Sequence, residues 1–187
     1  LTSLSDSIES LTHLESLNLS NNNLKKLSNK VFKLKELVFL DISGNNLEEI
    51  PSDIAFLKNL IIFNADNNIL SELPENFGNL KHLEILNIYN NNFKTFPENL
   101  LFLKNLKHLN FSNNQITAIP CDIIRLESLI YLNIGNNKIS ELPEELKKLK
   151  HLEELFFDNN PLRKPFCSEA LKTKEENTIT SQVPCTK

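Results

Sequence analysis

Four histidines and three cysteines are the side chains of this 187-residue chain best suited to metal or nucleophilic chemistry. Three of the histidines, His13, His82 and His151, occur at the same position of a 23-residue period. Three periods separate each from the next, which at about 4.8 Å per stacked strand is roughly 14 Å, too far to share a metal ion. No cysteine pair has zinc-ligand spacing, the glycines form no phosphate-binding loop, and no serine, histidine and acid are spaced as a triad. We therefore expect no catalytic residue, no metal site and no cofactor.

Asparagine is the residue whose spacing does suggest a chemical role, and that role is hydrogen bonding. One asparagine recurs every 23 residues, each time after a short apolar run: Asn22, Asn45, Asn68, Asn91, Asn114, Asn137 and Asn160. An amide both donates and accepts, so it can pair with buried backbone groups of its own coil and of a neighbouring coil. A leucine there would leave such groups unpaired, at about 1–3 kcal/mol each. We predict a buried asparagine ladder at these positions and interpret the adjacent Asn90 and Asn92 as turn-tolerant surface residues.

Each ladder asparagine belongs to one copy of the pattern L-x-x-L-x-L-x-x-N-x-L, as in LESLNLSNNNL and LKHLNFSNNQI. Seven repeats start at Leu14, Leu37, Leu60, Leu83, Leu106, Leu129 and Leu152, and residues 1–13 match the second half of another. The period near two in the first half of each repeat predicts a short strand, so that successive repeats stack as a parallel sheet. The three-to-four spacing of the second half, as in residues 139–151, predicts one or two helical or 3₁₀ turns on the outer side.

Charge and proline follow the same period. Proline opens five of the helical segments, acidic residues follow it, and a lysine column closes them at Lys58, Lys81, Lys104 and Lys150. This order suits a helix dipole, so we interpret the lysines as a solvated structural edge and not as a nucleic-acid patch. A net charge of −4 also disfavours nucleic acid as a partner, and no apolar run approaches the length of a membrane span.

The repeat pattern divides the chain into a repeat domain, residues 1–165, and a different C-terminal segment, residues 166–187. Phe166, Cys167, Ala170 and Leu171 could cover the last coil as a short capping helix, followed by a polar tail from Lys172 onward. Cys167 and Cys185 flank this tail and would form a disulfide if the protein is exported. The interpretation that we adopt is free thiols, including Cys121, in the cytoplasm, with a secreted or cell-surface protein as the alternative.

The strings LPEELKKLKHLEELFFDNNPL and IPSDIAFLKNLIIFNADNNIL resemble the 23-residue intracellular class of leucine-rich repeats found in Ras-binding and cell-polarity scaffolds. The resemblance covers residues 1 to about 165. It implies a curved, right-handed α/β solenoid, or horseshoe, whose concave parallel sheet binds other proteins. It carries no catalytic residue. The sequence departs from the most regular members at Ser28, which replaces a proline, and at Phe63 and Ala65, which replace leucines.

The residues expected to bind a partner lie on the outward face of the predicted strands. In the middle repeats this face carries large apolar residues, which strand alternation places opposite to the buried leucines. Framed by polar groups, such a stripe has the apolar centre and polar rim of a protein interface. Alternatively, these residues are present only because β-branched and aromatic side chains suit strands. The predicted partner-binding residues are Phe39, Asp41, Ile62, Asp66, Ile85, Tyr89, His108 and Tyr131.

We therefore predict a protein–protein interaction module of a scaffold or signalling protein, which binds a protein or peptide and is not an enzyme. Two alternatives use the same surface. One is a regulatory or substrate-recruiting segment of a larger phosphatase, cyclase or ligase. The other is an extracellular adhesin or receptor ectodomain.

Overall fold

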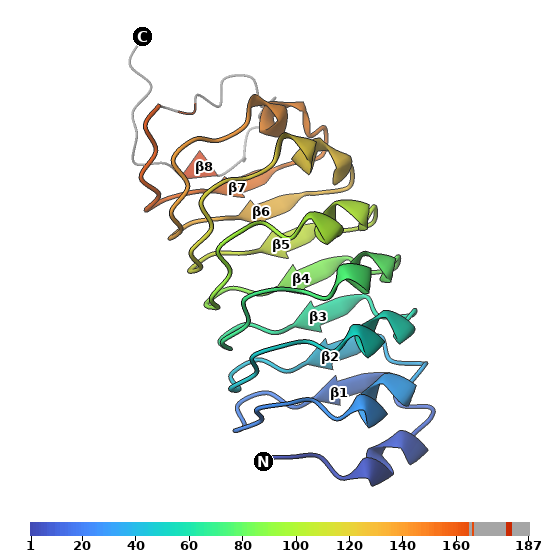
Figure 1. The fold of residues 1–187 in the computed structure, drawn as a ribbon. Coiled ribbons are helices and arrows are strands. Elements are labelled where there is room, and N and C mark those ends of the chain that lie inside the picture. The colour runs from blue at the N-terminus through green and yellow to red at the C-terminus, as the bar shows by residue number, and fades with distance from the viewer. Residues whose placement is uncertain (165, 167–178, 181–187) are drawn as a thin grey trace.

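The chain forms a stack of coils, each with one short strand and one 3₁₀ helix (Figure 1). A computed structural model describes residues 1–164, 166 and 179–180. The strands are β1 (Ser16–Asn18), β2 (Phe39–Asp41), β3 (Ile62–Asn64), β4 (Ile85–Asn87), β5 (His108–Asn110), β6 (Tyr131–Asn133), β7 (Glu154–Phe156) and β8 (Ile179–Thr180). The 3₁₀ helices are η1 (Asp6–Ser10), η2 (Asn29–Lys33), η3 (Ser52–Phe56), η4 (Glu75–Asn79), η5 (Glu98–Phe102), η6 (Cys121–Arg125) and η7 (Glu144–Lys148).

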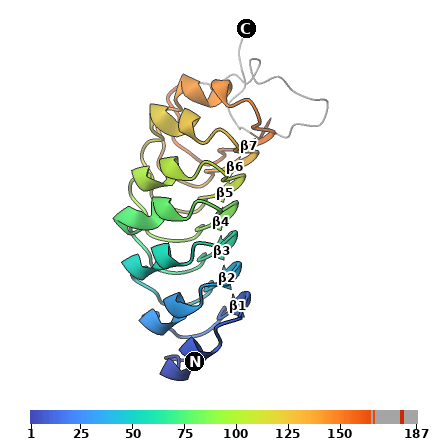
Figure 2. The same cartoon turned by 90° about the vertical axis from the view of Figure 1, so that its right-hand side faces the viewer.

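All the strands belong to one parallel sheet in the order of the sequence, β1 to β8. From β1 to β7 each residue pairs with the residue 23 positions later, so the sequence period becomes the register of the sheet. Figure 2 shows the sheet along the inner curve of a shallow arc and the 3₁₀ helices along the outer curve. The predicted parallel concave sheet is therefore confirmed. Strand β8 lies within the stretch expected to be a polar tail, and it pairs Ile179 with Leu155.

The helical half of each repeat is a 3₁₀ helix of five residues, which at about three residues per turn is fewer than two turns. Proline takes the N-cap position of η3 to η7, where its missing N–H costs no hydrogen bond. In η2 the side chain of Ser28 replaces proline and accepts a hydrogen bond from the N–H of Lys30 at 3.3 Å. After two of the helices, Lys35 and Lys81 each donate to a helix-terminal carbonyl, at 2.8 and 2.6 Å. Lysine therefore caps 3₁₀ helices at part of the predicted structural edge.

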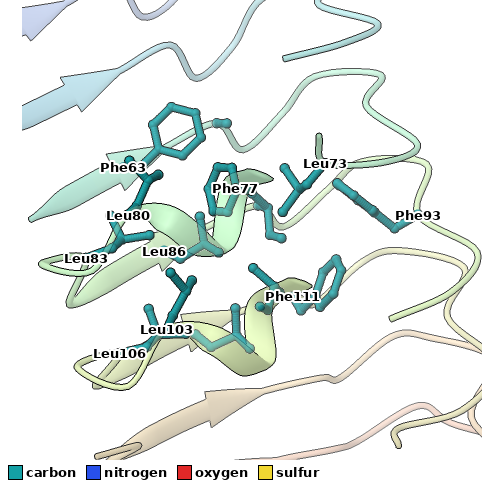
Figure 3. Packing of buried hydrophobic residues seen from close by; sticks show 14 of the residues in the cluster. Phe63, Leu73, Phe77, Leu80, Leu83, Leu86, Phe93, Leu103, Leu106 and Phe111 are labelled. Carbon is teal, nitrogen blue, oxygen red and sulfur yellow. The ribbon is translucent and has the colours of Figure 1, made fainter. Parts of the chain in front are cut away.

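A single apolar core runs the length of the stack between the sheet and the 3₁₀ helices. Figure 3 shows part of it, around Phe77 and Leu86. Phe63 and Ala65 replace the leucines of the most regular repeats, and both are fully buried in the core. The ring of Phe63 packs 5.9 Å from that of Phe77, across to η4. Phe166 is buried beyond the last repeat, with its ring 5.8 Å from that of Phe157. The remaining residues of the expected capping helix, Cys167, Ala170 and Leu171, lie outside the described part of the chain, as does Cys185.

Gly78 allows close approach of η4 and η5, and this contact makes a testable prediction. A Cβ atom on Gly78 would lie 2.5 Å from the carbonyl oxygen of Asn99 and 3.0 Å from the Cβ of Phe102. Relieving this overlap with backbone should cost about 1–3 kcal/mol, more than the roughly 0.4–1 kcal/mol that alanine gains by restricting the unfolded chain. We expect Gly78→Ala to lower the free energy of unfolding, as measured by urea denaturation.

The matched control is Gly135→Ala, because no atom lies closer to a Cβ there than the side-chain oxygen of Asn133 at 3.3 Å, and the equivalent positions of the adjacent repeats, Ser112 and Asp158, already carry a Cβ atom. This control should change stability little. Equal stabilities of the two variants would contradict the close approach at Gly78.

Candidate protein-binding surface

The turn after each strand is held by the asparagine ladder, whose interior members are buried: Asn45, Asn68, Asn91, Asn114 and Asn137. The Oδ1 atom of Asn91 accepts a hydrogen bond from the backbone N–H of Leu70 in the preceding coil at 3.0 Å. Its Nδ2 atom donates to the carbonyls of Ala65, in the preceding coil, and of Ile88, in its own coil. The terminal members, Asn22 and Asn160, are only partly buried. Asn160 makes the same set of hydrogen bonds as Asn91, whereas the Nδ2 atom of Asn22 donates only to carbonyls of its own coil. The ladder thus fixes each strand end relative to the strand before it.

A second asparagine row precedes the ladder by one residue, and the sequence interpretation missed its interactions. Asn90 has a φ of 51°, in the left-handed region that asparagine tolerates better than most residues. Its Nδ2 atom donates to the Oδ1 atom of Asn67 at 2.7 Å, and Asn159 donates to Asn136 in the same way at 2.8 Å. Asn90 is exposed, as expected, but it is both conformationally required and hydrogen-bonded. Asn92 is exposed, as predicted.

Five of the predicted partner-binding residues lie in one straight row across the sheet. Register pairs each with the next across strands β2 to β6, in the order Phe39, Ile62, Ile85, His108 and Tyr131. We call these residues the central row. Their side chains are half-buried and face away from the core, whereas the next residue of each strand is buried. Four steps of about 4.8 Å give the row a length of roughly 19 Å. Ser16 of β1 and Glu154 of β7 bound it.

Aromatic stacking extends the C-terminal half of the central row. The rings of His108 and Tyr131 stack at a centroid distance of 5.8 Å, and the ring of Phe156 lies 5.5 Å from that of Tyr131. Phe156 is absent from the sequence-based set. The available signal was that it interrupts a column of asparagines, since Asn133 pairs with Phe156 in the sheet register. Three rings thus form one continuous aromatic surface over β5 to β7.

Polar side chains line the side of the central row at which the strands end. Asp41 accepts hydrogen bonds from the backbone N–H and the hydroxyl of Ser43, at 2.9 and 2.6 Å. In the next two strands, Asn87 donates to Asn64 at 2.8 Å. These contacts fix the orientation of the carboxylate and amide groups. The apolar row therefore has a preorganised hydrogen-bonding border.

Asp66 and Tyr89 lie beyond this border, and both accept a hydrogen bond from the side chain of Asn67. The Nδ2 atom of Asn67 donates to Asp66 at 2.7 Å and to the Tyr89 hydroxyl at 3.3 Å. Burial raises the pKa of Tyr89, the hydrogen bond from Asn67 opposes this rise, and the Asp66 carboxylate adds to it. Tyr89 therefore presents a neutral hydroxyl, and Asp66 a carboxylate, at the same edge of the surface.

The concave surface carries an excess of negative charge. The outward positions of each repeat are the second, third, fifth and seventh. Over β1 to β7 they hold one lysine, Lys107, and seven carboxylates: Glu15, Asp41, Asp66, Glu84, Glu153, Glu154 and Asp158. This net charge of −6 exceeds the −4 of the whole chain. Lys107 is paired with Glu84 at 2.8 Å. The surface therefore favours a partner with positive charge around an apolar centre.

Within residues 1–164, 166 and 179–180, no three His, Cys, Asp or Glu side chains are grouped so as to hold a metal ion. Two of the equivalent histidines make unrelated contacts: His13 with Glu36 at 3.1 Å and His82 with the carbonyl of Lys58 at 2.9 Å. No helix in the same part of the chain is long and apolar enough to cross a bilayer.

Comparison with protein families agrees with this architecture. A family model described as a leucine-rich repeat region matches residues 3–96, and one described as two copies of leucine-rich repeats matches residues 104–144 and 127–169. The chain belongs to the leucine-rich repeat family. The resemblance inferred from the repeat pattern is confirmed at this level. None of the curated proteins matches the chain.

Solved leucine-rich repeat structures share the fold. A leucine-rich repeat protein from Leptospira interrogans has 33% identity and a TM-score of 0.73, over 86% of this chain and 47% of that one. The Arabidopsis receptor kinase HAESA, solved with the peptide hormone IDA and the co-receptor SERK1, has 28% identity and a TM-score of 0.76. The match covers 84% of this chain and 28% of that one. The ectodomain of the Arabidopsis receptor kinase GASSHO1/SCHENGEN3, in complex with CASPARIAN STRIP INTEGRITY FACTOR 2, has 29% identity and a TM-score of 0.73. The match covers 83% of this chain and 19% of that one.

The chain therefore spans less than half the length of each of these three relatives. The family and these structures identify it as a leucine-rich repeat module of the kind that mediates protein–protein interaction.

Proposed function

We propose that the concave sheet binds a protein or peptide, with the central row as its apolar anchor. The observation that carries the proposal is the alignment of Phe39, Ile62, Ile85, His108 and Tyr131 across five strands on the solvent side of the sheet. Large half-exposed side chains in the middle of an interface contribute most of the binding energy when a partner excludes water from them. The partner segment that fits is apolar at its centre and basic at its margins.

The border of the central row supports the same proposal. Asp41, Asp66 and Tyr89 would form hydrogen bonds or ion pairs with polar groups of the partner, on the side where the strands end. Their orientations are already fixed by Ser43 and Asn67, so little side-chain entropy is lost on binding. Two of the solved relatives are themselves complexes with a peptide hormone or with a named factor. For this chain, the scaffold or signalling role is part of the proposal.

Photo-cross-linking tests where the partner binds. A photoreactive amino acid in place of Ile62 or Ile85 should capture the same protein from an extract of the source cell. In place of Ala118, which is exposed on the edge where the strands lead into the 3₁₀ helices, it should not capture that protein. Capture from position 118 but from neither 62 nor 85 would contradict the concave assignment.

The receptor-ectodomain alternative is favoured by one observation, the likeness to plant receptor kinases. The two alternatives differ in the oxidation state of Cys167 and Cys185, which would be a disulfide in an exported protein and free thiols in a cytoplasmic one. Mass spectrometry of the protein purified from its source cell, before and after reduction, distinguishes the two: a mass increase of two hydrogens on reduction supports the exported form. The enzyme-segment alternative would require a catalytic domain elsewhere in the same polypeptide.

A further inference from the structure

A basic edge runs along the solenoid where the 3₁₀ helices lead into the strands. It consists of two columns, one formed by the last residue of each 3₁₀ helix and the other by the residue two places later. The second column is mostly lysine: Lys35, Lys58, Lys81, Lys104 and Lys150. In the first column, Lys33, Arg125 and Lys148 share the positions with Phe56 and Phe102.

The basic edge has a net charge opposite in sign to that of the whole chain. The two columns hold eight cations and one carboxylate, Glu127, for a net charge of +7, although the whole chain carries −4. The opposite edge, where the strands lead into the helices, is mixed. Its two columns, which run from Lys25 and Lys26 to Arg163 and Lys164, hold five cations and four carboxylates. Capping hydrogen bonds to helix-terminal carbonyls are made by Lys35, Lys81 and Lys104, so within the described part of the chain such bonds do not account for the other five cations of this edge.

Exposed apolar side chains lie among these cations. Phe56 is 51% exposed, Phe102 is 47% exposed, and Ile124 is 37% exposed. The Nζ atom of Lys35 lies 4.5 Å from the ring centre of Phe56, and the guanidinium of Arg125 lies 4.8 Å from that of Phe102. These three are half of the six large apolar side chains that are exposed within the described part of the chain. Cations and apolar groups therefore share one continuous surface.

We propose that the basic edge binds the surface of a bilayer that contains anionic phospholipids. Each lysine or arginine near such a surface increases binding by about fivefold, and aromatic and aliphatic side chains can enter the headgroup layer. A single-stranded nucleic acid would need free ring faces for base stacking. The rings of Phe56 and Phe102 already have cations over their faces. The acidic concave surface would be repelled by the same lipids, which favours an orientation that leaves it accessible to a partner.

Vesicle co-sedimentation tests the proposal with a charge-matched control. The probe is vesicles of phosphatidylcholine with about 30% phosphatidylserine, compared with phosphatidylcholine alone, at about 0.1 M salt where exposed charges still interact. The edge variant is Lys58→Glu/Lys150→Glu, because neither ammonium group makes a hydrogen bond or ion pair within the described part of the chain. The control is Lys25→Glu/Lys26→Glu on the opposite edge, which changes the net charge by the same amount.

We expect the wild type and the control to bind the anionic vesicles, and the edge variant to bind them at least tenfold more weakly. Replacing Phe56 with serine should weaken binding without changing its salt dependence. Three outcomes would overturn the proposal: no binding of the wild type to anionic vesicles, equal loss in both charge variants, or binding to a single-stranded oligonucleotide but not to vesicles.

Discussion

Asn91→Leu should unfold at markedly lower denaturant concentration than the wild type, with a loss of about 3 kcal/mol in the free energy of unfolding. Leucine has the same branched arrangement of four side-chain heavy atoms, but its methyl groups cannot accept the hydrogen bond from the buried N–H of Leu70. An unpaired buried donor costs about 1–3 kcal/mol, and the lost donation by Nδ2 adds roughly 1 kcal/mol. The carbonyls of Ala65 and Ile88 keep a second ladder partner, Asn68 and Asn114 respectively, which limits the loss.

The control for this prediction is Asn92→Ala, because Asn92 is exposed and only its backbone N–H is used, in a bond to the carbonyl of Leu70. It should change stability by less than about 0.5 kcal/mol. Asn90→Ala is unsuitable as a control, since alanine is strained at a φ of 51° and the bond to Asn67 is lost. Urea unfolding of the two variants tests whether the ladder stabilises the fold. Equal unfolding midpoints for Asn91→Leu and Asn92→Ala would show that it does not.

The fold was predictable because a strict 23-residue period determines three features together. It repeats the buried leucines, it places an asparagine at each turn, and it becomes the strand register, in which Leu40 pairs with Phe63 and Phe63 with Leu86. Side chains on the solvent side of the sheet follow from the same alternation, so the central row could be identified by counting. No such rule exists beyond the last repeat, where the period ends and strand β8 was not anticipated.

The residues that sequence reasoning missed depend on contacts between different positions of neighbouring coils. Phe156 joins the concave rings because it lies diagonally beside Tyr131, and a column-by-column comparison does not show this contact. Likewise, Phe56 and Phe102 have apolar side chains in positions that helical spacing suggests could be core. They are exposed because the residues two places before them, Ile54 and Leu100, already fill the core. Exposure at the end of a five-residue 3₁₀ helix is decided by packing and not by periodicity.

The second large effect concerns partner binding. Ile62→Glu/Ile85→Glu should weaken binding of the cross-linked partner by at least about a hundredfold, because two carboxylates would be buried against its apolar groups. A hundredfold loss is about 2.7 kcal/mol, within the range of two central interface residues. Both positions are half-exposed and face away from the core in the free protein, so the fold should tolerate the change. Urea unfolding of the double variant checks that it does.

The matched control is Ile69→Glu/Ile124→Glu, which makes the same substitutions and the same charge change at two exposed isoleucines outside the central row. Isothermal titration of the captured partner into the wild type and both variants is the most direct test of concave binding. We predict unchanged affinity for the control and at least a hundredfold loss for Ile62→Glu/Ile85→Glu. Equal affinity of the wild type and a correctly folded Ile62→Glu/Ile85→Glu variant would contradict binding at the central row.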